Sequence, residues 1–180
     1  FMESIILSIT SLLDIHDTYT KNHSENVANI SMNIGRQLDL DQKEITKVFY
    51  AGLVHDIGKT LIPSTILNKP SQLEEEEYSI VKQHSKWGCD ALKKMRELSD
   101  IYQVVLYHHE SFDGSGYPNG LAGNDIPVLS RILTVADAYD AMTNDRPYRL
   151  AMSYEEAKEE LLRCCRSQFD PTIVQAFLSI

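Results

Sequence analysis

The sequence lacks the features of several classes of protein. It has three cysteines in 180 residues, Cys89 and the adjacent pair Cys164 and Cys165, without the spacing of a disulfide framework or a zinc site. No apolar run reaches the ~20 residues that a membrane-spanning helix needs, and no basic region precedes the first apolar stretch. These absences favour reduced thiols in a cytoplasmic protein and no membrane segment in this chain.

Basic residues are also scarce. Lysine and arginine together number 17 against 26 aspartates and glutamates, which gives a net charge of −9. Such a balance disfavours the broad phosphate-binding face of proteins that bind nucleic-acid polymers. An anionic ligand would therefore have to be attracted by a local basic cluster or by bound cations.

Helical periodicity dominates the rest of the sequence, and no segment is typical of a strand. Apolar residues follow the i, i+3, i+4, i+7 rule in two early segments. These residues are Ile5, Ile6, Ile9, Leu12 and Leu13 in the first segment, and Val27, Ile30, Ile34 and Leu38 in the second. Asp41 is a candidate N-cap for a third helix that would run to about Asp56, before Gly58 ends it.

Further helices are expected in the second half of the chain. The acidic turn 74–77 would begin a long helix that ends near Leu98, and Ser99 or Asp100 would cap the next one. The remaining predicted segments are a loop over 112–127, helices over 128–142 and 154–163, and a last helix after Pro171. With 43% hydrophobic residues, we predict an all-α, single-domain bundle of about eight helices, in which 1–16 form a helix or linker that packs on a domain of 17–180.

Histidines and aspartates on the predicted helices indicate a metal site. Five of the six histidines lie there, namely His23, His55, His84, His108 and His109. Apolar neighbours in the stretch LVHDIGK carry His55 and Asp56 inward, and a buried carboxylate is costly unless it meets a cation or another charged partner. Asp137 and Asp140 lie three residues apart on one face of an otherwise apolar helix.

These residues resemble the HD superfamily of metal-dependent phosphohydrolases. The pair His55-Asp56, with His23 upstream and Asp137 downstream, carries this likeness. Longer motifs are similar to those of the HD-GYP subfamily: HHE at 108–110, DGSGYP at 113–118 and RPYR at 146–149. The resemblance extends from about residue 14 to residue 178.

The resemblance implies an HD-type helical fold and a phosphodiesterase that hydrolyses cyclic di-GMP to linear pGpG, with further conversion to GMP left open. It also implies two or three iron or manganese ions. The implied ligands are His23, His55, Asp56, His84, His108, His109 and Asp137. Asp56 would bridge two ions, one completed by His84, His108 and His109 and the other by His23, His55 and Asp137. Imidazole and carboxylate ligands suit iron and manganese, although they also admit zinc, nickel or cobalt.

One departure from the family pattern affects the number of ions. Family members with a third metal carry a glutamate four residues before the first histidine, where this chain has Tyr19. Tyrosine, with a pKa near 10, is a poor ligand for a divalent ion. We therefore expect two ions and mostly pGpG as product, with Asp17 or Glu25 as alternative third-site ligands.

The expected chemistry is attack by a hydroxide held between two cations about 3.5–4 Å apart. With Asp56 as bridging ligand, Lys59 would neutralise a phosphate oxygen, or it is simply a lysine at a helix C-terminus. Arg146 and Arg149 would hold the second phosphate or a guanine edge. Asp140 would bond to Arg146 or to a metal-bound water. In the glycine-rich loop, Gly114 and Gly116 permit positive φ angles, and Gly116 and Tyr117 are candidate substrate contacts, with Tyr117 favoured as a pin that holds the loop rather than as a stacking platform.

Two other functions remain open at this point. One is hydrolysis of a different cyclic dinucleotide, such as cyclic GMP-AMP. The other is a module that senses cyclic di-GMP without cleaving it, which would be expected to have lost ligands that this chain retains. The apolar stripe in 1–16 would be core, a homodimer contact, or the connection to a fused sensory or receiver domain.

Overall fold

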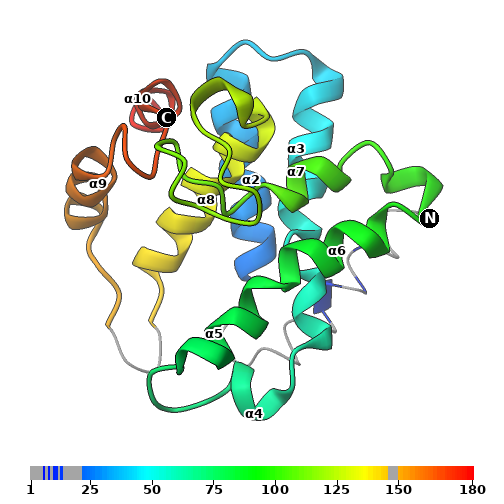
Figure 1. The fold of residues 1–180 in the computed structure, drawn as a ribbon. Coiled ribbons are helices and arrows are strands. Elements are labelled where there is room, and N and C mark those ends of the chain that lie inside the picture. Colours follow the sequence, from blue (N-terminus) through cyan, green and yellow to red (C-terminus); the bar gives the residue numbers. More distant parts are fainter. Residues whose placement is uncertain (1–5, 7, 9, 12, 14–21, 146–149) are drawn as a thin grey trace.

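The structure is a computed structural model that describes residues 6, 8, 10–11, 13, 22–145 and 150–180. Within these ranges the chain is helical and forms no β-sheet (Figure 1), which confirms the predicted all-α bundle. The elements are α2 (His23–Gln37), α3 (Gln42–Val54), η1 (Ile57–Leu61), α4 (Ser64–Leu67), α5 (Glu75–Lys82), α6 (His84–Leu92), η2 (Arg96–Leu98), α7 (Tyr102–Leu106), η3 (Gly123–Asp125), α8 (Val128–Thr143), α9 (Tyr154–Arg163) and α10 (Pro171–Phe177).

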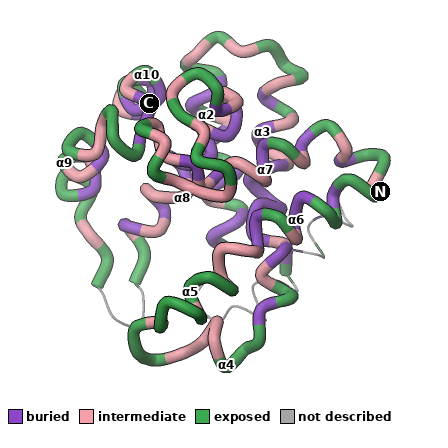
Figure 2. The backbone as a smooth tube through the Cα atoms, viewed as in Figure 1, coloured by how far each residue is buried: buried purple, intermediate pink, exposed green. Residues whose placement is uncertain are grey.

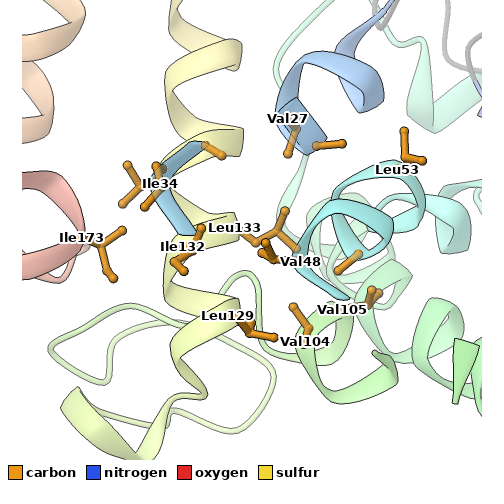
Figure 3. Close-up of a cluster of buried hydrophobic side chains, with 14 of the residues drawn as sticks. Val27, Ile34, Val48, Leu53, Val104, Val105, Leu129, Ile132, Leu133 and Ile173 are labelled. Carbon is orange, nitrogen blue, oxygen red and sulfur yellow. The ribbon is translucent and has the colours of Figure 1, made fainter. Parts of the chain in front are cut away.

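Helix α2 forms the centre of the bundle, packed against α3 and α8 (Figure 1). Its predicted apolar face points into the core, where Val27 and Ile34 lie among side chains of α3, α8 and α10 (Figure 3). Gly52 allows α2 and α3 to approach closely, because a Cβ there would lie 2.6 Å from the Cα of Ala28. The core therefore fixes α2, α3 and α8 relative to one another, and these three helices hold His23, His55 and Asp137.

Local capping explains where several helices begin. Asp41 accepts a hydrogen bond from the backbone N–H of Glu44 at 2.8 Å, so the predicted N-cap of α3 is confirmed. Ser153 and Glu156 form a capping box at the start of α9, whose bounds match the predicted helix.

The long helix predicted from 74 to about Leu98 is wrong. Helix α5 ends at Lys82, where the N–H of Gln83 bonds the carbonyl of Ile80 at 3.0 Å and tightens the last turn, and α6 starts anew at His84. Helix α6 in turn ends at Leu92, and Met95 is extended before the short η2. The interruption at Gln83 leaves the His84 side chain at a helix start rather than inside a helix.

Neither Ser99 nor Asp100 caps the next helix. Ser99 donates its hydroxyl to the carbonyl of Arg96, and Asp100 pairs with Lys47 at 3.4 Å. Helix α7 is shorter than expected. It ends at Leu106, and the two histidines at 108–109 lie in the turn that follows.

Burial is uneven along the bundle (Figure 2). Helix α8 has nine buried residues, whereas α4 and α5 have none. In the N-terminal segment, Ile6 and Leu13 are buried while Ser8 and Ser11 are exposed; Ile5, Ile9 and Leu12 of the predicted stripe lie outside the described residues. No helix in the described ranges combines the length and apolarity needed to cross a bilayer.

Candidate functional site

The five histidines singled out in the sequence all lie at helix ends. His23 is the first residue of α2 and His84 the first of α6, whereas His55 directly follows α3 and His108 and His109 follow α7. The prediction that all five lie on helices is therefore wrong for the last three. Helix ends that meet at one place can bring side chains of four elements together, which a single helix face cannot do.

A glycine brings two of these ends into contact. Gly58 was expected to end α3, but α3 stops at Val54 and Gly58 lies inside η1. A Cβ at Gly58 would lie 1.9 Å from the carbonyl oxygen of His84, so only glycine lets η1 lie against α6. This approach places Asp56 beside His84, with 3.5 Å between Oδ1 and Nε2.

Three of the histidine rings are oriented by backbone carbonyls. In each case Nδ1 bonds the carbonyl three residues earlier. The distances are 2.8 Å from His55 to Gly52, 2.7 Å from His84 to Val81 and 2.6 Å from His108 to Val105. Because a carbonyl can only accept, Nδ1 carries the hydrogen and Nε2 keeps a lone pair. This is the arrangement that metal-ligating histidines adopt.

The Nε2 atoms of three histidines converge on one point. The Nε2 of His84 lies 3.4 Å from that of His108 and 3.2 Å from that of His109. Burial lowers the pKa of all three side chains, that of His109 to about 3, so the neutral, ligand form is favoured. The Nε2 of His55 is buried and has no hydrogen-bond partner among the residues that the structure describes. A cation would satisfy these nitrogens.

A second group combines histidine with carboxylate. The Nε2 of His23 lies 3.2 Å from Oδ1 of Asp137, and the Nε2 of His55 lies 3.9 Å from the same oxygen. Burial alone would lower the pKa of His23, but hydrogen bonds to Asp137 and Asp140 outweigh it and raise that pKa to about 9. For Asp137, burial alone would raise the pKa, yet the hydrogen bond to His23 holds that pKa below the ordinary value. The group attracts positive charge.

Asp56 joins the two groups. Its Oδ1 faces His84, and its Oδ2 lies 3.4 Å from Nε2 of His55 and 2.7 Å from Nζ of Lys59. Burial alone would raise the pKa of Asp56, but the charges of Lys59 and His55 lower it well below its usual range. The ligand atoms lie within 4.8 Å of one another in three sets: His84, His108 and His109; His23, His55 and Asp137; His55, Asp56 and His108. The structure thus brings together all seven predicted ligands, and their nitrogen and oxygen donors fit divalent iron or manganese.

Asp140 has a contact that the sequence did not indicate. Its Oδ2 lies 2.6 Å from Nδ1 of His23, and its Oδ1 accepts a hydrogen bond from Asn26 at 2.9 Å. The expected partner Arg146 lies outside the described residues, as do Arg149, Tyr19 and Asp17. Asp140 therefore does for His23 what backbone carbonyls do for three other histidines. A carboxylate in this position also makes the imidazole a stronger ligand.

A pocket of about 440 Å³ opens beside the cluster. Asp56, Lys59 and Asp137 lie on its wall together with Gly116 and Tyr117 of the predicted loop. The lining also includes Tyr78 and Gln168, which the sequence reasoning missed. A larger hollow of about 530 Å³ lies elsewhere, near Arg131 and Asp170, and contains none of the predicted site residues.

The loop after the histidine pair is held in place by a buried carboxylate. Glu110 accepts hydrogen bonds from the backbone N–H groups of Asn119 at 2.7 Å and Leu121 at 3.0 Å. The Tyr117 ring stacks on the His109 ring with centroids 4.9 Å apart. The backbone N–H of Tyr117 donates a hydrogen bond to the His109 carbonyl at 3.1 Å. These contacts agree with the expectation that Tyr117 pins the loop.

The two glycines of this loop act differently. Gly114 has a φ of 86°, as expected. Gly116 does not have a positive φ. It is needed because a Cβ there would lie 2.2 Å from the backbone nitrogen of Ser111.

Comparison with known proteins places this arrangement in a family. A family model for the HD domain matches residues 8–173. The chain belongs to the HD domain family. It is 40% identical to a cyclic di-GMP phosphodiesterase of Pseudomonas aeruginosa over 92% of this chain and 40% of that protein. It is 38% identical to a 3'3'-cGAMP-specific phosphodiesterase of Vibrio cholerae over 85% of this chain and 36% of that protein.

A solved structure has the same HD domain fold. The structure of a cyclic GMP-AMP specific phosphodiesterase of V. cholerae superposes with a TM-score of 0.75 at 23% identity, covering 97% of this chain and 47% of that one. The resemblance read from the sequence is confirmed. The chain spans half or less of the length of the curated relatives it matches.

Proposed function

We propose that this HD domain hydrolyses cyclic di-GMP to linear pGpG at a centre of two divalent metal ions. The observation that carries the proposal is the pair of ligand sets joined by Asp56, which opens onto a pocket lined by Lys59. The cyclic di-GMP phosphodiesterase that is 40% identical to the chain supports the choice of substrate.

The proposed ligands are those that the structure brings together. His84, His108 and His109 would hold one ion, and His23, His55 and Asp137 the other, with Asp56 shared between them. Two bound cations would supply an activated water and stabilise the charge that develops on a phosphate under in-line attack. The carbonyl-bonded imidazoles keep the ligand geometry fixed, so the chain needs little rearrangement to bind them.

Lys59 is the proposed phosphate contact. Its Nζ lies 2.7 Å from Oδ2 of Asp56, at the wall of the pocket. An ammonium group has three donors, so it can keep one bond to Asp56 and direct another to a non-bridging phosphate oxygen. Asp56 thus holds the catalytic lysine at the place where a phosphate would lie.

The remaining substrate contacts are proposed from the sequence. Gly116 and Tyr117 line the pocket and are the proposed substrate contacts of the loop. Arg146 and Arg149 would bind the second phosphate or a guanine edge. Asp140 would act on substrate only through His23, whose ring it orients.

The proposal also includes two iron or manganese ions per chain and pGpG as the main product. Metal analysis of anaerobically purified protein, together with analysis of the products from cyclic di-GMP, tests it directly. We expect about two ions per chain and accumulation of pGpG before GMP. A third ion with rapid release of GMP alone would contradict the two-metal assignment.

A second candidate substrate is 3'3'-cGAMP, which the relative at 38% identity supports. Turnover of a panel of cyclic dinucleotides would rank the two. A sensor that binds without cleaving is disfavoured by the complete ligand set, and it predicts binding of cyclic di-GMP with no product in the presence of iron or manganese.

Residues 17–180 form the proposed catalytic domain, and 1–16 a helix that packs on it. The burial of Ile6 and Leu13 supports that packing. We also propose that this helix either forms a homodimer contact or joins a sensory or receiver domain. The measured mass in solution distinguishes a dimer from a monomer. The three free cysteines support a cytoplasmic location.

A further inference from the structure

Tyr78 is a pocket residue that the proposed chemistry does not use. It lies on α5, a helix without buried residues (Figure 2), and 46% of its surface is exposed. It nevertheless lines the same pocket as Asp56, Lys59 and Asp137. A large aromatic ring beside a charged catalytic cluster offers a surface that a flat ligand can cover.

The position of the ring is set by a lysine one turn later. Nζ of Lys82 lies 4.5 Å from the centroid of the Tyr78 ring and 5.6 Å from that of Tyr117. The ammonium group therefore contacts both rings, and such a contact is attractive because the ring face is negative. Tyr117 is already stacked on His109. Of the two tyrosines, Tyr78 is the one whose ring has no aromatic partner among the described residues.

A cyclic dinucleotide presents two kinds of surface to this pocket. Its phosphates require cations, and the ligand cluster with Lys59 provides the place for one of them. Its purine bases have two flat faces each, and proteins commonly bind such faces by stacking them on aromatic rings. With one phosphate at the cluster, a base that lies along the pocket wall would reach the exposed Tyr78 ring.

We propose that Tyr78 is the platform on which one purine base of the substrate stacks, and that Lys82 is a positioning residue that holds its ring. The inference rests on the proposed function, because it assumes a cyclic dinucleotide substrate. It adds a specificity element that no metal ligand supplies: the enzyme distinguishes a nucleotide diester from a diester without a base.

Steady-state kinetics on two substrates test this platform. Tyr78→Ala should raise KM for cyclic di-GMP about 10- to 100-fold with kcat little changed, which is the usual effect of removing one base-stacking ring. Hydrolysis of the abasic analogue, the same cyclic ribose diester with no base and no other flat ring, should be unchanged. Tyr78→Phe should keep the wild-type KM, since the ring is retained.

The chain offers a matched control on α9. Tyr154 is 44% exposed and has Lys158 over its ring at 5.9 Å, the same spacing of tyrosine and lysine, but it does not line the pocket. Tyr154→Ala should leave both substrates unaffected. Lys82→Met should raise KM for cyclic di-GMP by a smaller factor than Tyr78→Ala, and Lys82→Arg should restore it.

The outcomes separate the two proposals. If the wild type cleaves cyclic di-GMP and Tyr78→Ala has an unchanged KM, or slows both substrates equally, the platform is wrong and the proposed function stands. If the wild type cleaves only the base-free diester and no cyclic dinucleotide, the proposed function fails and the platform fails with it.

Discussion

The two halves of the ligand cluster differ in charge. One half consists of the neutral imidazoles of His84, His108 and His109, whose pKa values burial lowers. The other half combines His23 and His55 with Asp137, and the neighbouring carboxylates raise the pKa of His23 to about 9. A cation in the second half would be held by local negative charge, whereas a cation in the first half would have Asp56 as its one carboxylate ligand among the described residues. Asp56 is therefore the residue on which both halves depend.

Asp56→Asn should have the largest effect. Loss of the shared carboxylate should remove both ions and lower the rate about 10³-fold, because metal stabilisation of the transition state is worth several kcal/mol and each ~1.4 kcal/mol is tenfold. Metal analysis and kcat for cyclic di-GMP check this. Circular dichroism must show an intact helical fold. Retention of both ions at normal rate would show that Asp56 does not bridge.

His109→Gln and Asp137→Asn should each impair metal binding in one half of the cluster only. Each should reduce the metal content from about two ions per chain to about one, because each removes a ligand from one set only. We expect the metal ion that remains in Asp137→Asn to bind more tightly than metal does in Asp56→Asn. Titration of metal-free protein with Mn²⁺ measures both the number of sites and their affinity. Loss of both ions in either variant would mean that the halves are one cooperative site.

The ligands of both halves could be named from the sequence, but their geometry could not. Residue types and motifs identify His55 and Asp56, yet the positions of the histidines at helix ends depend on where each helix stops. Gln83 and Leu106 carry no glycine or proline signal, so the sequence does not show that helices end near them. Tertiary packing, such as the close approach of Gly58 to α6, decides these ends.

The supporting residues were harder to predict for a different reason. Asp140 was recognised as unusual, but its partner His23 lies 117 residues away in sequence, on a helix whose orientation relative to α8 is not encoded locally. Tyr78 looks like any other tyrosine on a polar helix. Only the pocket that α5 helps to line gives it a role. Contacts between elements are what periodicity and spacing leave undetermined.

Asp140→Asn sharpens the comparison at the carboxylate half. The substitution keeps the size of the side chain but removes the charge that orients His23, so metal affinity in this half should fall about 10- to 100-fold while the histidine half is unaffected. Competition with a metallochromic chelator measures the two affinities. Asp90→Asn, at an exposed carboxylate on α6, serves as the control and should change neither. An equal loss at both sites would argue for a general structural effect.

Glu110→Gln should have the smallest effect on the metal content. It should weaken the order of the loop without abolishing it. One carboxylate oxygen would become an amide NH₂ facing a backbone N–H of Asn119 or Leu121, which costs about 1–3 kcal/mol for the unpaired donor. Chemical denaturation should show a loss of stability of this size, and KM should rise because the loop lines the pocket. Tyr117 stacks on His109, so any change in affinity should occur in the histidine half alone. A matching change at Asp137 and His23 would show instead that the loop supports both halves, and that their difference in charge does not make them independent.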